Sequence, residues 1–111
     1  MLQERYGGWL YRRTADAFAS YAEHVARRLG DRIAWWLTIN EPWCIATQGY
    51  AVGTHPPYLH DETTVLQVAH HLLLAHGLAV PRIRQHSKPE GSPSVSHLSI
   101  PPIRAPRPSR R

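Results

Sequence analysis

Apolar residues recur three and four positions apart between Thr14 and Gly30, which is the spacing of one helix face. Thr14 suits an N-cap, Asp16 follows in the first turn, and Gly30 suits a C-cap. The expected buried stripe consists of Phe18, Tyr21, Ala22, Val25, Ala26 and Leu29. The pattern therefore predicts an amphipathic helix that begins at Thr14 and ends at Gly30.

Residues 33–39 form an almost unbroken apolar run that is rich in β-branched and aromatic side chains. A run without alternation is typical of a strand that is covered on both faces. The turn signal Asn40-Glu41-Pro42 follows it, and Pro42 is expected to bias the backbone of Glu41 toward an extended conformation. We therefore expect a buried strand with Asn40 and Glu41 at its C-terminal end.

Residues 44–60 contain two glycines and the Pro56-Pro57 pair, a composition that predicts a loop. A second helix is expected to start at Asp61-Glu62, because acidic side chains suit a helix N-terminus, and to end near Pro81. Its apolar stripe consists of Val65, Leu66, Val68, Ala69, Leu72, Leu73 and Ala79. The order helix, strand, loop, helix predicts an α/β fold with parallel strands.

Charge and aromatic content divide the chain at residue 80. Residues 1–80 hold six arginines against seven acidic residues, a net charge of −1, whereas residues 81–111 hold seven basic residues against one acid, a net charge of +6. All ten aromatic residues precede residue 59, and seven of the ten prolines follow residue 80. We expect a folded segment over 1–80 and a disordered Pro/Arg/Ser-rich tail over 81–111, whose composition suggests a frameshift of a GC-rich coding sequence.

Length and composition exclude several classes of protein. A chain of 111 residues has room for one small domain. The single cysteine, Cys44, allows no intrachain disulfide and favours a reducing compartment, so a cytoplasmic location is expected. We find no signal-peptide core and no apolar run of about 18 residues, and therefore expect no membrane association. His70, His71 and His76 lack the i, i+4 spacing of paired ligands, which argues against a metal site.

The residues with the clearest chemical potential are Asn40 and Glu41, an amide and a carboxyl group at the end of the predicted strand. The C-terminal ends of strands carry the active sites of α/β enzymes. Glu41 is therefore a candidate catalytic residue. The alternative is a carboxylate that caps the loop after it, and the residues alone leave both interpretations open.

The run Thr38-Ile39-Asn40-Glu41-Pro42 resembles the Thr-x-Asn-Glu-Pro signature of family-1 glycoside hydrolases, the β-glucosidase and β-galactosidase group. Flanking segments resemble the loops and helices around the third and fourth barrel strands of that family: 2–10, 18–28, 49–56 and 69–77. The resemblance covers about residues 2–80. It does not extend to 82–111, which do not resemble the fifth strand.

This resemblance implies a fragment of a (β/α)8 TIM barrel, comprising helix 3, strand 4 and helix 4, about one quarter of the whole. It implies retaining hydrolysis of a β-glucoside or related saccharide, without metal or cofactor. Glu41 would be the general acid/base and Asn40 would hydrogen-bond the 2-hydroxyl of the sugar. Trp43 would line the sugar site or belong to the core.

The sequence departs from the family in its second catalytic carboxylate. The nucleophile motif Glu-Asn-Gly occurs nowhere in the chain, and we therefore expect the isolated chain to be inactive. The alternative function is a small basic interaction protein whose tail binds nucleic acid or an anionic surface. The tail lacks aromatic residues for base stacking, which argues against nucleic acid.

Overall fold

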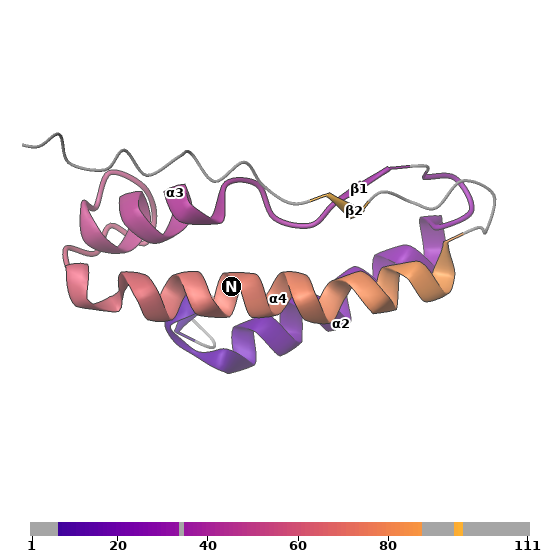
Figure 1. Cartoon of the computed structure of the whole chain (residues 1–111), viewed down its shortest axis with the longest axis horizontal. Coiled ribbons are helices and arrows are strands. Elements are labelled where there is room, and N and C mark those ends of the chain that lie inside the picture. Colours follow the sequence, from indigo (N-terminus) through magenta and orange to yellow (C-terminus); the bar gives the residue numbers. More distant parts are fainter. Residues whose placement is uncertain (1–6, 34, 88–94, 97–111) are drawn as a thin grey trace, which may run out of the picture.

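The computed structural model describes residues 7–33, 35–87 and 95–96. Its elements, in chain order, are η1 (Gly8–Leu10), α2 (Arg12–Leu29), β1 (Trp36–Leu37), α3 (Pro42–Ala46), η2 (Thr47–Ala51), η3 (Glu62–Thr64), α4 (Val65–His86) and β2 (Val95–Ser96). The long helices α2 and α4 pack against each other, and β1, β2 and α3 lie along one side of α4 (Figure 1). Helix α4 is therefore the central element of the described fold.

Helix α2 begins at Arg12, two residues before the predicted start, with Tyr11 as its N-cap. The prediction that Thr14 is the N-cap is wrong. Thr14 lies buried in the first turn, and its hydroxyl donates a hydrogen bond to the carbonyl of Gly8 in η1. The C-cap at Gly30 is confirmed, because its N–H donates to the carbonyl of Ala26 at 2.8 Å.

The buried face of α2 is made of small residues and differs from the predicted stripe. Tyr21 is 66% exposed and Leu29 is 40% exposed, although both were expected inside. The fully buried or nearly buried apolar side chains of α2 are Ala15, Ala19, Ala22 and Ala26. Alanines allow the axis of α4 to approach closely, so the larger apolar residues of α2 lie at the edges of the contact.

Helical structure starts where it was predicted, but its first turn is η3, and α4 itself begins at Val65 and extends further than predicted. The Asp61 carboxylate caps η3, because it accepts a hydrogen bond from the backbone N–H of Thr63 at 3.0 Å. The end near Pro81 is wrong, because the helix continues through this proline to His86. Of the tail 81–111 that was predicted to be disordered, residues 81–86 are helical and 95–96 form β2, whereas 88–94 and 97–111 lie outside the described residues.

Contacts with α2 explain why the last turns of α4 persist beyond Pro81. Ile83 is buried in the contact between the two helices. The Glu23 carboxylate of α2 lies 3.7 Å from the Arg82 guanidinium and 3.5 Å from the imidazole of His86. These packing and charge contacts offset the free-energy cost of the backbone hydrogen bond that Pro81 removes from the helix.

The predicted strand over 33–39 is shorter than expected and is covered on one face. Only Trp36 and Leu37 form β1, which pairs in parallel with β2 and is connected to it through α4. Trp36 is 9% exposed, but Trp35 and Leu37 are 72% and 78% exposed, so burial on both faces is wrong. The parallel pairing agrees with an α/β arrangement, while the described residues form no barrel that could cover the second face.

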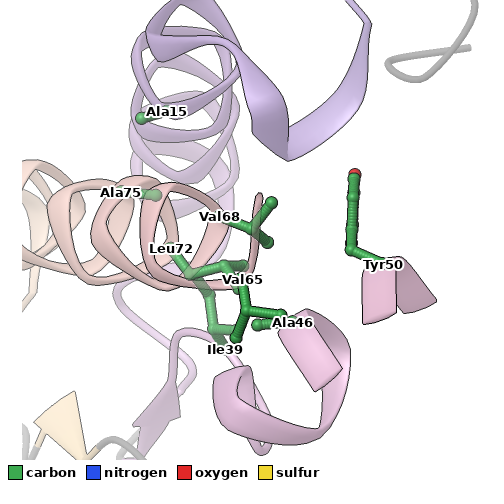
Figure 2. Close-up of a cluster of buried hydrophobic side chains, with 8 residues drawn as sticks. All are labelled: Ala15, Ile39, Ala46, Tyr50, Val65, Val68, Leu72 and Ala75. Atoms are coloured by element: carbon green, nitrogen blue, oxygen red, sulfur yellow. The ribbon is translucent and has the colours of Figure 1, made fainter. Parts of the chain in front are cut away.

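Two apolar clusters stabilise the described fold. The larger cluster joins α2, α3, η2 and α4 around the chain segment after β1 (Figure 2). Its members are Ala15, Ile39, Ala46, Tyr50, Val65, Val68, Leu72 and Ala75. The smaller cluster contains Ala22, Ala26, Trp36, Ala79 and Ile83. Ile39 belongs to the larger cluster, so the core fixes the position of the chain just before Asn40 and Glu41.

The segment Glu62–His86, which includes α4, is long and apolar enough to cross a bilayer, by length and composition alone, with a mean hydropathy of 1.2. No such segment was expected from the sequence. In the structure 22% of its apolar window is buried, and its buried residues include Val68 and Leu72, while the helix packs along α2.

Candidate active site

Glu41 occupies the N-cap position of α3, directly after Asn40 and four positions after Leu37, the last residue of β1. Its backbone is left-handed, with φ 44° and ψ 60°, so the expected extended conformation is wrong. Pro42 is the first residue of α3, a position that suits proline, and the chain must turn sharply to enter the helix there. A left-handed conformation costs a residue with a side chain about 1–2 kcal/mol.

The Glu41 side chain makes no capping hydrogen bond, although its backbone carbonyl accepts one from the N–H of Ile45 at 3.1 Å. The carboxylate therefore does not cap the segment after it, which was the alternative to a catalytic role. Among the described residues, no basic side chain forms an ion pair with it. An exposed carboxylate in a strained backbone position fits a functional site better than a structural one.

Glu41 and Asn40 line the same open depression, which has a volume of about 340 Å³. The remaining lining residues are Cys44, Ile45, Gln48, His55 and Pro56. The structure therefore brings together two of the three residues singled out in the sequence. The third, Trp43, is not among the lining residues and is 37% exposed, so it is not a fully buried core residue.

Helical structure after Glu41 supplies the wall of the depression. Residues 42–51 form α3 and η2, so the prediction of a loop from residue 44 is wrong over 44–51. Cys44 and Gln48 lie four positions apart and thus share a helix face. The backbone N–H of His55 donates to the carbonyl of Gln48 at 3.1 Å, which brings the following loop to the same rim. Gln48 and His55 were not predicted as site residues, although the spacing 41, 44, 48 is a signal that points to Gln48.

Cys44 is half-buried and lines the depression together with Glu41. Desolvation and the neighbouring Glu41 carboxylate raise the pKa of its thiol above the ordinary value. A raised pKa keeps the thiol protonated at neutral pH, and only the thiolate is a strong nucleophile. Cys44 is therefore a neutral hydrogen-bonding group in this site.

The strand end that carries the site is tied to α4 through Thr38. Its hydroxyl lies 2.7 Å from Nδ1 of His76, and this pair is partly buried. Ile39, the next residue, is 8% exposed within the larger cluster. Thr38 is thus bonded to α4 and Ile39 is packed in the core. These two contacts limit where the following residues, Asn40 and Glu41, can move.

Tyr50 supports the site from the buried side of η2. It is 1% exposed, and its hydroxyl oxygen accepts a hydrogen bond from the backbone N–H of Trp9 at 2.9 Å. Burial raises the pKa of Tyr50, and the hydrogen bond from Trp9 opposes part of that effect. Tyr50 thus connects the N-terminal segment with the helical wall of the depression.

We expect Tyr50→Phe to lower the free energy of unfolding by about 1 kcal/mol at pH 7, because the partly buried Trp9 N–H loses its acceptor. Since the folded-state pKa of Tyr50 is raised, the folded state retains a proton that the unfolded state loses at alkaline pH. Wild-type stability should therefore fall as the pH rises above the ordinary tyrosine pKa.

Urea unfolding of wild type and Tyr50→Phe between pH 7 and pH 11 measures both effects. The alkaline loss of stability should be smaller in Tyr50→Phe, and Tyr58→Phe, at a side chain that is 61% exposed, is the matched control. An identical alkaline loss in wild type and Tyr50→Phe would contradict this prediction.

Within the part of the chain that the structure describes, no group of three or more His, Cys, Asp or Glu side chains could hold a metal ion. His70 and His71 are neighbours, with ring centroids 5.6 Å apart, and His71 is engaged with the carbonyl of Trp9 at 2.8 Å. His70 therefore contacts the ring of His71, and His71 also contacts the backbone of Trp9.

The sequence model of glycosyl hydrolase family 1 matches residues 1–108. This chain belongs to that family. The match continues beyond the segment 2–80 to which the sequence analysis assigned the resemblance, and it includes the two residues of β2. The restriction of the resemblance to residues before 82 is therefore wrong.

Curated relatives and solved structures agree with this membership. The bifunctional β-D-glucosidase/β-D-fucosidase of Bifidobacterium breve is 44% identical over 92 residues, which cover 83% of this chain and 20% of the relative. The β-glucosidase A of Acetivibrio thermocellus is 43% identical over 76% of this chain and 18% of its own length. This family member thus spans about a fifth of the length of the curated relatives it matches.

The solved structure of a Thermotoga maritima family 1 glycoside hydrolase, in complex with a cyclophellitol analogue that mimics the transition state, is similar over 85% of this chain and 20% of its own length. The TM-score is 0.78 at 35% identity. Such relatives are TIM barrels, and the described part of this chain matches a helical fragment of one.

Proposed function

We propose that Glu41 and Asn40 serve the retaining hydrolysis of β-glucosides within a complete family 1 barrel. Glu41 is the general acid/base, and Asn40 hydrogen-bonds the 2-hydroxyl of the sugar. The observation that carries this proposal is that both residues, three and four positions after the end of β1, line one open depression, where the Glu41 carboxylate makes no capping bond. The C-terminal ends of barrel strands hold the catalytic residues of such enzymes.

Retaining hydrolysis needs two carboxyl groups about 5 Å apart. One protonates the glycosidic oxygen, and the other attacks the anomeric carbon to form a glycosyl-enzyme intermediate, which water then hydrolyses. Among the described residues that line the depression, Glu41 is the one carboxylate. The contribution of this chain is therefore proton transfer and sugar binding, and we propose that residues 1–111 alone do not turn over a β-glucoside.

Trp43 is the third residue in the proposal, as a neighbour of the sugar site. Its ring is 37% exposed and lies outside the lining of the depression. An aromatic face packs well on a pyranose ring, and the exposed part of Trp43 is available for that contact once further barrel segments enclose the sugar.

A chimera tests the function in the context that the chemistry needs. Residues 7–87 of this chain replace the matching segment of the Thermotoga maritima family 1 glycoside hydrolase, and release of nitrophenol from an aryl β-glucoside is measured. We expect turnover by the chimera and none by purified 1–111. A chimera that unfolds cooperatively but does not hydrolyse the glucoside would contradict the assigned function. Turnover by 1–111 that Glu41→Gln abolishes would contradict the proposed inactivity.

A further inference from the structure

The pair of Thr38 and His76 joins the chain just before the site to α4, and the proposed reaction gives this pair no role. Thr38 follows β1 and lies three positions before Glu41. Its hydroxyl oxygen is 2.7 Å from Nδ1 of His76, and the pair is partly buried. Residues 38–40 belong to no helix or strand of the described structure, so their position depends on side-chain contacts.

One face of α4 carries the residues that meet β1 and the segment after it. Leu72, His76 and Ala79 are four and three positions apart, which places them on the same side of a helix. Ile39 lies with Leu72 in the larger apolar cluster (Figure 2), and Trp36 lies with Ala79 in the smaller one. The hydrogen bond to His76 is therefore located between two apolar contacts along α4.

This hydrogen bond fixes what the apolar contacts leave open. Burial of apolar surface is non-directional, so the two clusters alone allow the chain to shift along α4 or to rotate about its own axis. A hydrogen bond is sensitive to both distance and angle. The bond between Thr38 and His76 therefore sets the rotation of the backbone just before Asn40 and Glu41.

Glu41 depends on that restraint. Its side chain is exposed and makes no capping hydrogen bond, whereas a catalytic group must be held within about 0.5 Å of its productive geometry. Its backbone is left-handed, with φ 44°, so the chain turns sharply just after residues 38–40. A small rotation of that segment would redirect the carboxylate away from its place at the depression.

We propose that Thr38 and His76 are positioning residues for Glu41, and that their hydrogen bond sets the direction in which the chain delivers the carboxyl group to the depression. This inference rests on the proposed function of Glu41 and extends that function to a side chain of α4. Neither Thr38 nor His76 acts on the substrate. Loss of their bond impairs proton donation while the apolar contacts with α4 persist.

The 15N resonance of His76 Nδ1 in full-length 1–111 reports the contact without enzyme activity. It is recorded at about pH 8 and assigned by its loss in His76→Asn. Thr38→Val removes the hydroxyl and retains the branched shape, so the resonance should move. Thr38→Ser retains the hydroxyl and should leave the resonance near its wild-type position. Thr64→Val, whose lost hydroxyl donates to the carbonyl of Asp61 at 2.8 Å, is the matched control and should not move it.

The chimera shows whether the contact serves proton donation. Thr38→Val should lower kcat/KM for an alkyl β-glucoside about tenfold, because a misplacement of about 1 Å can cost up to about a hundredfold. The loss should be much smaller for a dinitrophenyl β-glucoside, whose leaving group needs no proton. Thr38→Ser should restore most of the loss, and Thr64→Val should leave kcat/KM unchanged for both substrates.

His76→Leu approaches the same bond from the other side, because it removes the imidazole and leaves the Thr38 hydroxyl in place. It should lower kcat/KM for the alkyl glucoside at least as much as Thr38→Val. If both substitutions act through one bond, Thr38→Val should cause little further loss when it is added to His76→Leu. Cooperative urea unfolding is required of every chimera, and Thr38→Ala replaces Thr38→Val if the valine variant fails this requirement.

Three results would overturn the inference. The first is a His76 resonance that Thr38→Val leaves in place, and the second is additive losses in the double variant. The third is a loss of kcat/KM that is equal for both leaving groups or that Thr38→Ser does not restore. Failure of the proposed function gives a different result, because the chimera with both residues intact would then not hydrolyse either glucoside, while the His76 resonance would still respond to Thr38→Val.

Discussion

Gly30→Ala is expected to lower the free energy of unfolding by about 3 kcal/mol. A β-carbon at Gly30 would overlap the carbonyl oxygen of His86 and lie 2.5 Å from the carbonyl oxygen of Ala26. Both atoms belong to helix backbones, so neither can move without shifting α2 or α4. The end of α4 rests directly on the end of α2, and only a residue without a side chain fits between them. Urea unfolding of the full chain at pH 7 measures the loss.

Gly77→Ala is the matched control for this substitution. Gly77 lies in the middle of α4, and a β-carbon there would meet nothing within 4 Å. Alanine has a higher helix propensity than glycine, so Gly77→Ala should raise the free energy of unfolding by about 0.5–1 kcal/mol. Effects of the same sign and size at both positions would contradict the close approach of the two helices at Gly30.

Local patterns in the sequence predicted which polar residues meet at the depression better than they predicted the structure around it. Asn40 and Glu41 were singled out because an amide and a carboxyl group follow an apolar run, and the structure places both at one depression. Gln48 and His55 were missed because the glycines and prolines of 44–60 favoured a loop. A glycine can occupy a helix when the chain packs closely around it, and a β-carbon on Gly49 would come within 2.8 Å of the carbonyl oxygen of Pro56.

Long-range packing explains why other predictions failed. The stripe of α2 was assigned from the spacing of its apolar residues, and it included the buried Ala22 and Ala26. The larger members Tyr21 and Leu29 are exposed, because small side chains at the contact let α2 and α4 approach closely. Pro81 was taken as a helix end, but Ile83 and the contacts to Glu23 hold the turns after it. Trp35 and Leu37 are exposed because the described residues cover β1 on one face only. Periodicity cannot report which residues pack together when they are distant in the sequence.

Glu41→Gln in the chimera is expected to lower kcat/KM about a thousandfold for a β-glucoside whose leaving group is a poor one, such as an alkyl alcohol. This loss corresponds to about 4 kcal/mol of transition-state stabilisation. Glutamine retains the size of the side chain but cannot donate the proton that the departing oxygen needs. With a dinitrophenyl leaving group, which departs without protonation, the loss in kcat/KM should be much smaller. Glu62→Gln in the same chimera is the control.

The dependence on the leaving group separates a catalytic Glu41 from a structural one. A residue that only shaped the turn into α3 would, when substituted, disturb the site for every substrate and lower kcat/KM by a similar factor throughout the series. The left-handed backbone at Glu41 makes this distinction necessary, because a substitution at a strained position also acts on stability. Glutamine has the same branching at the β-carbon as glutamate, so the backbone cost is equal in both proteins. A uniform loss across the series would therefore assign Glu41 to the turn, whereas a loss confined to poor leaving groups identifies the proton donor.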